Sequence, residues 1–163
     1  MARNRRIPDS EVFQAILALI AADGEKAVAL SAVARATGLA APTLVQRFGT
    51  RAGMVQAALL SAWDAADAVA ITADAGAAMT AKGAQEFLKL LGGMDISVLA
   101  ASVRDAELRD RAAGWRGRVE AALAARLGGN AAALVFAAWQ GQAIWKAAGG
   151  KGFRLKDAIK ELG

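Results

Sequence analysis

Apolar residues recur three and four positions apart along almost the whole of this chain, and that spacing decides the fold class. In the first such segment, "EVFQAILALIAADG", one helical face collects Val12, Phe13, Ile16, Leu17 and Ile20. No long run alternates between apolar and polar residues, as a strand with one buried face would. The sequence therefore predicts an all-α protein.

Capping residues predict where the first two helices begin and end. Asp9 or Ser10 is expected to cap the first helix, because a side-chain oxygen can accept one of the unpaired backbone N–H groups. Gly24 is expected to end it. After the short connector "EKAVAL", Ser31 is expected to cap a second helix, "AVARATG", that ends at Gly38.

The second and third helices have the lengths and the tight turn of a helix-turn-helix. Pro42 is tolerated in a first helical turn, so the third helix is expected to run to about Phe48. Thr50 would then cap a long fourth helix. An ordinary helical hairpin in a bundle would give the same pattern, and the outer face of residues 42–48 would then have no function.

The remaining chain predicts further helices and no long linker. A link of small residues, "DAGAAMTAKG", follows the fourth helix. The helical segments after it are "AQEFLKLLGG", "MDISVLAASV", "DAELRDRAAGWRGRVEAALAARLGG", "NAAALVFAAWQGQAIWKAAGG" and "RLKDAIKELG".

The chain has 163 residues and lacks Cys, His and Tyr, which excludes most catalytic chemistry. Without Cys there is no disulfide or thiolate, and without His the commonest general base and metal ligand is missing. We therefore expect no enzymatic activity, no cofactor and no metal site. An enzymatic interpretation would require the acidic middle of the chain, with Asp64, Asp67 and Asp95, to bind a metal.

Charge is distributed unevenly along the sequence. Residues 1–53 hold seven Lys and Arg against four acids, residues 54–103 hold two against five, and residues 104–163 hold eleven against six. A basic N-terminal part favours an anionic partner. The N-terminus lacks the apolar core of a signal peptide, and the uncharged run 127–145 is interrupted by Gly, Asn and Gln. We expect a soluble, cytoplasmic protein without a membrane segment.

Self-association is expected because 56% of the residues are apolar. The helix around residues 131–147 is the expected dimer seam, through Ala132, Val135, Phe136, Trp139 and Ala143. The same apolar helix could instead be buried within one protomer.

Residues 30–59, "LSAVARATGLAAPTLVQRFGTRAGMVQAAL", resemble the tetracycline-repressor (TetR) family of bacterial transcriptional regulators. The likeness covers the N-terminal third of the chain and rests on Gly38, Leu39, Thr43, Leu44, Phe48 and Arg51. The later part is similar only in architecture, with Gln140-Gly141 where the family often has an acidic residue and Gly. The resemblance implies a helix-turn-helix domain at 1–50, joined through a long helix to an effector-binding and dimerisation domain at 51–163.

Two positions depart from the family pattern. Ala40 lies where the family usually has a Ser or Thr cap, and Val45 lies where it usually has Tyr. Both usual residues contact phosphate, so their absence should weaken binding that does not depend on DNA sequence. Arg47, where the family often has His or Tyr, could restore a charged contact.

The resemblance implies that the third helix enters the major groove of operator DNA. Gln46 is the best candidate for base recognition, since its amide can bond adenine N6 and N7 together. The N-terminal arginines Arg3, Arg5 and Arg6 would neutralise phosphates or enter a minor groove. The candidate DNA-binding residues are Ser31, Ala41, Pro42, Thr43, Gln46, Arg47 and Arg51.

The resemblance also implies a small effector, mainly apolar or aromatic, whose binding tilts the fourth helix and separates the two DNA-binding heads. Large apolar side chains outside the third helix could line its pocket, with Gln140 or Asp64 offering hydrogen bonds. The candidate pocket residues are Trp63, Phe87, Met94, Trp115, Phe136, Trp139 and Gln140.

The sequence thus favours a homodimeric, ligand-responsive transcriptional regulator, expected to be a repressor, that binds palindromic double-stranded DNA. The alternative is a helical ligand-binding or interaction module that shares the fold but recognises no specific DNA sequence.

Overall fold

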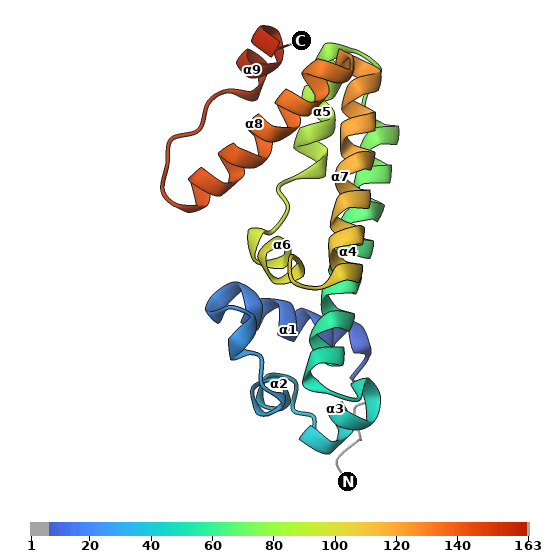
Figure 1. Ribbon diagram of the computed structural model, residues 1–163, viewed down its shortest axis with the longest axis vertical. Helices are drawn as coiled ribbons and strands as arrows, with labels where there is room; N and C mark the ends of the chain where they lie inside the picture. The colour runs from blue at the N-terminus through green and yellow to red at the C-terminus, as the bar shows by residue number, and fades with distance from the viewer. Residues whose placement is uncertain (1–6, 163) are drawn as a thin grey trace. The chain divides into compact units, whose positions relative to one another are not determined.

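The computed structural model describes residues 7–162, which form α-helices and one short 3₁₀ helix and contain no strand (Figure 1). The all-α prediction is therefore confirmed. The arm arginines Arg3, Arg5 and Arg6 lie outside the described residues. The chain packs as two compact units: unit 1 is Met1–Trp63 with Ser97–Arg109, and unit 2 is Asp64–Ile96 with Asp110–Gly163. Helices α4 and α7 contribute to both units.

Unit 1 contains the N-terminal helices, the first half of α4 and most of α6. Its apolar core is made of aliphatic side chains from α1, α2, α3 and α4, which the 3.6-residue spacing turns toward one another. The best-buried of these are Val12, Ile16, Val33, Leu44, Met54 and Leu59. The elements are α1 (Asp9–Asp23), η1 (Glu25–Ala27), α2 (Leu30–Thr37), α3 (Ala41–Phe48), α4 (Arg51–Gly76) and α6 (Ile96–Ser102).

The predicted N-caps of the first two helices are wrong. α1 has Pro8 at its N-cap and α2 has Ala29, and neither end has a side-chain cap. Ser31 lies inside the first turn of α2, because the helix already starts at Leu30. The prediction for Thr50 is confirmed, since its hydroxyl accepts a hydrogen bond of 3.0 Å from a backbone N–H in the first turn of α4.

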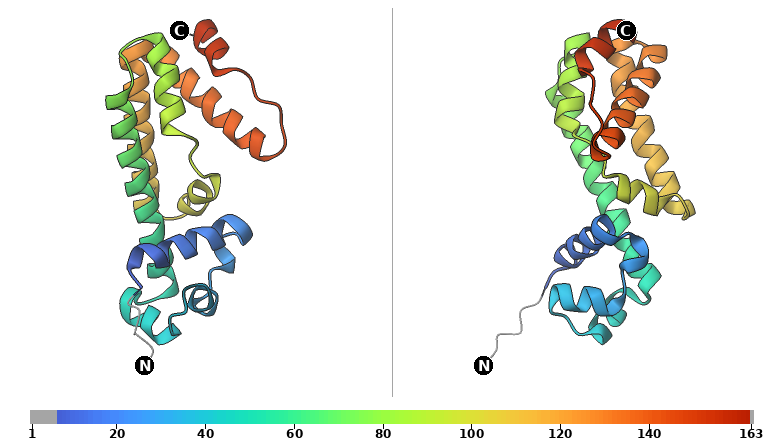
Figure 2. Two further views of the ribbon diagram at one scale, coloured as in Figure 1. Left: turned by 180° about the vertical axis from the view of Figure 1, so that it is seen from behind. Right: turned by 90° about the vertical axis from the view of Figure 1, so that its left-hand side faces the viewer.

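Unit 2 contains the second half of α4, α5 (Ala81–Leu91), most of α7 (Ala106–Leu127), α8 (Gly129–Ala147) and α9 (Leu155–Leu162). α4 continues to Gly76, so the first part of the expected link is helical. Thr80 caps α5 by accepting a bond of 3.0 Å from the Gly83 N–H. α9 packs against α8 and α5, as both views show (Figures 1 and 2).

A buried arginine joins α7 to the end of α4 within unit 2. The Arg126 side chain is fully buried and donates to the carbonyl oxygens of Asp74, Ala77 and Ala78 at 3.0 Å each. It also bonds the Asp74 carboxylate at 2.6 Å, and its guanidinium lies over the Phe87 ring at 5.3 Å. One side chain therefore bonds a carbonyl in the last turn of α4 and the carbonyls of the two residues that follow the helix.

α4 is long and apolar enough to cross a membrane by length and composition alone, since an 18-residue window of it has a mean hydropathy of 1.3. The uncharged run of the sequence, residues 127–145, lies mainly in α8 instead. Core helices can meet the same criteria, and α4 carries the buried side chains Met54, Leu59 and Trp63 as well as several charged ones. We interpret α4 as a core helix.

The predicted dimer seam on α8 is corrected in part. Ala132, Val135 and Phe136 are buried within unit 2, so they are not available to a second chain. The apolar side chains that α8 exposes lie on its other face, where Leu134 is 54% exposed and Trp145 is 69% exposed.

Candidate functional site

The turn between α2 and α3 is fixed by local hydrogen bonds. Gly38 adopts the left-handed conformation, with φ 72°, that glycine tolerates best, and its N–H bonds the Ala34 oxygen at 2.9 Å. The Thr37 hydroxyl donates to the Val33 oxygen at 2.8 Å and accepts from the Leu39 N–H at 3.3 Å. Only three residues therefore separate the end of α2 from the start of α3.

The N-terminal end of α3 has small side chains and no side-chain cap. Ala40 is the N-cap, and its carbonyl oxygen accepts the N–H of Thr43 at 2.9 Å. Pro42 lies in the first turn, where it removes no helical hydrogen bond, as predicted. The first turn therefore presents little bulk to anything that approaches it.

One anchor orients α3. Leu44 is completely buried, so the opposite face points to solvent and carries Pro42, Val45 and Gln46, all exposed. Thr43 and Ala41 flank this face and are half-buried. We call Pro42, Val45 and Gln46 the outer face of α3.

Val45 also belongs to this face. It was not among the candidate DNA-binding residues and was noted only as a departure from the family pattern. It is 44% exposed, which is unusual for a large aliphatic side chain on a short helix. The signal was in the sequence, since Val45 lies three residues after Pro42 and directly before Gln46. An exposed aliphatic group beside an amide suits a thymine methyl next to an adenine.

The other predicted side chains differ in availability. Ser31 is exposed on α2. Arg47 is only 24% exposed: its guanidinium pairs with the Asp9 carboxylate, donates to the Ile7 oxygen at 2.9 Å and lies over the Phe48 ring at 5.6 Å. A phosphate would have to displace these partners.

Arg51 is also held by the chain itself. Its Nε donates to the Val28 oxygen at 2.6 Å, and its terminal nitrogens contact the carbonyl oxygen and the carboxylate of Glu25. The side chain therefore ties the start of α4 to η1.

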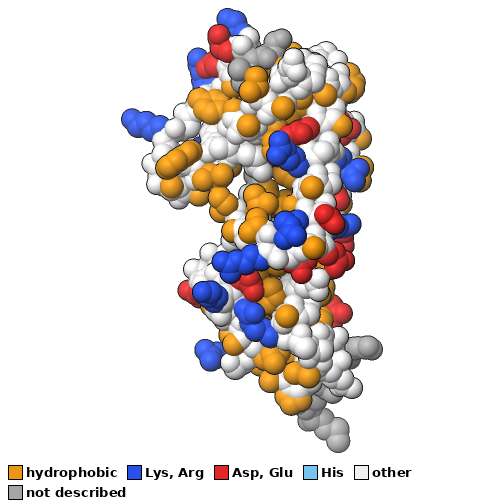
Figure 3. Space-filling model, viewed as in Figure 1, with side chains coloured by type: hydrophobic (Ala, Val, Ile, Leu, Met, Phe, Trp, Pro, Cys, Tyr) orange, Lys and Arg blue, Asp and Glu red, His pale blue; other side chains and the backbone are white. Residues whose placement is uncertain are grey.

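The described part of unit 1 carries no net charge. It has six Lys and Arg and six Asp and Glu. On the face drawn in Figure 3, its basic side chains lie among apolar and uncharged ones rather than forming a continuous basic surface. The positive excess of the N-terminal part therefore comes from Arg3, Arg5 and Arg6.

The predicted effector-pocket residues fall into both units. Trp63 belongs to unit 1, is 1% exposed, and donates its indole N–H to the buried Ser102 hydroxyl at 3.0 Å. The other six belong to unit 2: Phe87, Met94, Trp115, Phe136, Trp139 and Gln140.

Three of the six form an aromatic cluster. The ring centroids of Trp115 and Phe136 are 6.1 Å apart, those of Trp115 and Trp139 are 6.4 Å apart, and those of Phe136 and Trp139 are 6.0 Å apart. Phe87 is fully buried, and Met94 and Gln140 are half-buried.

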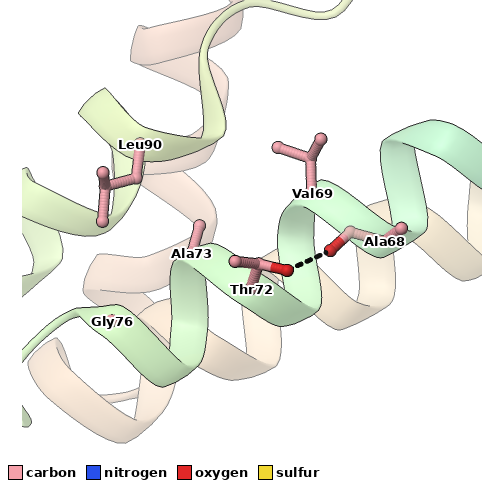
Figure 4. A pocket seen from close by; sticks show the side chains of 6 residues that line it. All are labelled: Ala68, Val69, Thr72, Ala73, Gly76 and Leu90. Carbon is pink, nitrogen blue, oxygen red and sulfur yellow. Dashed lines mark hydrogen bonds between the residues drawn. The ribbon is translucent and has the colours of Figure 1, made fainter.

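Two grooves lie on the surface of the described part of unit 2. One, of about 570 Å³, lies between α4 and α5 and is lined by Ala68, Val69, Thr72, Ala73, Gly76 and Leu90 (Figure 4). Its hydroxyl, from Thr72, donates to the Ala68 oxygen of its own helix at 2.9 Å. The groove therefore offers an apolar surface. The second groove, of about 650 Å³, lies between α5, α8 and the start of α9.

The acidic residues considered for a metal are engaged elsewhere. Asp64 pairs with Arg111, and the Asp67 carboxylate lies 3.1 Å from Nε of Arg118. Within residues 7–162, no group of three potential ligands with metal-site geometry is found.

Comparisons with known proteins relate the chain to others by fold. No family model matches the sequence, and no curated protein matches it. The multidrug binding protein EbrR, in complex with proflavin, is 22% identical over 94% of this chain and 96% of its own, with a TM-score of 0.64. A Rhodococcus sp. protein assigned to the TetR family of transcriptional regulators is 21% identical over 94% of this chain and 93% of its own, with a TM-score of 0.61. The chain has the fold of these proteins, and the predicted resemblance is confirmed at the level of the fold.

Proposed function

We propose that this protein is a homodimeric, ligand-responsive transcriptional repressor of the TetR type that binds palindromic operator DNA through α3. The observation that carries the proposal is the outer face of α3: a short helix with a lean start, anchored by the buried Leu44, that exposes Pro42, Val45 and Gln46. A helix of this kind after a tight glycine turn is the reading element of a helix-turn-helix.

Base recognition in this proposal comes from neighbouring side chains on α3. Gln46 bonds adenine N6 and N7, and such a bidentate pair is worth about 1–3 kcal/mol of discrimination. Val45 contacts the methyl group of an adjacent thymine. Thr43, at the edge of the outer face, bonds a base edge or a phosphate, and Ala41 and Pro42 allow the backbone to come close.

Phosphate contacts come mainly from outside α3. Ser31 is exposed on α2, and the arm supplies Arg3, Arg5 and Arg6. Arg47 and Arg51 act by holding α3 and α4 in place, because both guanidinium groups already have partners within the chain. The affinity of this protein for DNA then depends more on base contacts than the affinity of a regulator whose recognition helix is basic.

The second chain binds to the outer face of α8. Leu134, Ala137, Ile144 and Trp145 are exposed there, with the half-buried Gly141 among them. Burying these side chains would remove the largest exposed aromatic of the described residues from water. A dimer also places two copies of α3 on two half-sites of one operator.

The effector is a small, mainly apolar or aromatic molecule. Support comes from the aromatic cluster of Trp115, Phe136 and Trp139, and from the fold shared with EbrR, which binds proflavin, a planar aromatic compound. We propose that effector binding in unit 2 shifts α4, which continues from there into unit 1, and so changes the spacing of the two DNA-binding heads.

Selection of random duplex DNA by the purified protein tests the proposal. Wild type is compared with Gln46→Ala and with Gln14→Ala, a matched control for an exposed glutamine on α1. We expect a palindromic motif that Gln46→Ala blurs at one position in each half-site and that Gln14→Ala leaves intact. Binding without any enriched motif, or no binding at low salt, would contradict the proposal and favour a ligand-binding module without DNA recognition.

The dimer is tested separately by sedimentation. Trp145→Glu places a charge in the proposed seam and should shift the protein toward monomer, whereas Lys151→Glu, on the exposed loop after α8, should not. An unchanged dimer in Trp145→Glu would place the interface elsewhere.

A further inference from the structure

The groove between α5, α8 and the start of α9 has an unusual lining. Four of its side chains are basic, Lys89, Lys146, Arg154 and Lys156, and no Asp or Glu lines it. The carboxylate closest in sequence belongs to Asp157, which contacts Nε of Arg154 at 2.7 Å. Three lysines therefore surround a volume of about 650 Å³ without an acidic partner in its wall.

The walls of this groove are held in place by packing against α8. α9 is attached through Ile159, which is 6% exposed and lies on the side that packs on α8 and α5. The loop before α9 runs close to α8, since a Cβ on Gly152 would lie 2.5 Å from the Gln142 amide nitrogen. On the α5 side, a Cβ on Gly93 would lie 3.8 Å from Ala143. Glycine at position 152 therefore leaves room for the Gln142 side chain, whereas the approach at Gly93 is an ordinary van der Waals distance.

The floor of the groove is apolar. Leu88 is 1% exposed, and Trp139 is half-buried and fixed from behind by its contacts with Trp115 and Phe136. The amides of Gln85 and Gln142 lie at the side and can donate or accept hydrogen bonds. A flat apolar surface with basic side chains around it is complementary to an amphipathic anion.

We propose that this groove binds a small organic anion, an aryl or acyl carboxylate. Its apolar body lies against Trp139 and Leu88, and its carboxylate accepts hydrogen bonds from Lys146 and Lys156. The negative charge of the bound anion reduces the electrostatic repulsion between the lysine ammonium groups. A bound cation such as proflavin would increase the unfavourable electrostatic energy of the groove. The site is independent of DNA recognition by α3, and its existence can be tested without DNA.

The test uses the full chain and 1-anilinonaphthalene-8-sulfonate, an aryl anion whose sulfonate stands for the carboxylate. Binding is followed by probe fluorescence and by energy transfer from tryptophan. We expect one site per chain, weaker binding as salt is raised, and reduced energy transfer in Trp139→Phe, with the remainder coming from Trp115, whose ring lies 6.4 Å from that of Trp139. Lys146→Gln and Lys156→Gln should each weaken binding by about fivefold, the effect of losing one partly exposed charged partner.

The matched control is Lys160→Gln, one turn after Lys156 on α9 but outside the groove lining, and it should bind the probe like wild type. Circular dichroism checks that each variant is folded. Equal binding in all three glutamine variants, several weak sites, or competition by inorganic phosphate as effective as that by benzoate would overturn the proposal. The last outcome would assign the basic side chains to a simple anion without an apolar body. Failure of this test leaves the proposal for α3 untouched, because no DNA is present.

Discussion

Replacing Arg126 should be the most damaging single substitution of a charged residue in unit 2. The side chain is fully buried, and it donates to three backbone carbonyl oxygens, one in the last turn of α4 and two directly after it, in addition to the Asp74 carboxylate. Removing it takes this donor from the Asp74 and Ala77 carbonyls, whereas the Ala78 carbonyl keeps the Thr80 N–H at 3.0 Å. It also removes the contact with the Phe87 ring.

The magnitude follows from the bonds that are lost. Hydrogen bonds to a charged group contribute about 1.5–3 kcal/mol each, but water can reach part of the α4 end, so Arg126→Ala should cost roughly 3–5 kcal/mol. For a chain of this size, each kcal/mol lowers Tm by about 2–4 °C, which gives a fall of about 6–20 °C. Asp74→Ala should cost only about 0.5–1 kcal/mol, because the carboxylate is 49% exposed and screened by water.

Urea unfolding followed by circular dichroism measures both variants, at two protein concentrations to separate folding from dimerisation. The double variant should be no less stable than Arg126→Ala alone, because Asp74 has no further partner once the arginine is gone. If Asp74→Ala were as destabilising as Arg126→Ala, the ion pair would dominate and the carbonyl cap would be refuted as the reason.

Three further predictions concern glycine, the arm and Arg47. Gly83→Ala should strongly destabilise the protein in thermal melts, because a Cβ there would lie 1.7 Å from the Ala78 oxygen. Gly114→Ala, whose Cβ would meet nothing within 4 Å, should instead stabilise the protein by about 0.5–1 kcal/mol. Similar Tm values for the two variants would disprove the packing argument. Replacing Arg3, Arg5 and Arg6 by Ala should reduce the slope of log K for DNA binding against log salt concentration by about 2.7, at about 0.9 per phosphate contact. Fluorescence anisotropy at several salt concentrations measures this salt slope. An unchanged slope would mean that the arm makes no phosphate contact. Arg47→Ala should lower the free energy of unfolding by about 1 kcal/mol and leave the salt slope unchanged, since the Arg47 guanidinium is held by Asp9 and Ile7. A salt slope lower by about one, with an unchanged Tm, would instead show a phosphate contact.

The parts of the fold that the sequence predicts are those set by neighbouring residues. The turn at Gly38, the first turn of α3 with Pro42 and the cap at Thr50 each depend on residues within four positions, so their chemistry is visible in the sequence. The cap of α2 was missed because Ser31 is one of the best capping residues, whereas the helix starts two residues earlier than predicted, at Leu30 after the N-cap Ala29. Tertiary packing overrides a local preference of this size.

The parts that could not be predicted depend on partners far apart in the chain. Arg47 and Asp9 are 38 residues apart, and Arg126 and Asp74 are 52 apart, so nothing near either arginine identifies its partner. α8 poses a different problem, because both of its faces are apolar. Periodicity locates such faces but does not tell which one is buried, and the predicted seam fell on the inner face with Val135 and Phe136.

The tryptophans of this chain provide separate optical reporters of its two units. Trp63 belongs to unit 1 and is buried against Ser102, whereas Trp115, Trp139 and Trp145 belong to unit 2. Because the sequence has no Tyr, their emission carries no tyrosine background, and the 69% exposed Trp145 should emit at longer wavelengths than the buried Trp63. Because Trp115 of unit 2 is also buried, comparing the unfolding curves of wild type and Trp63→Phe would separate the two units and reveal whether they melt as one cooperative block or in succession.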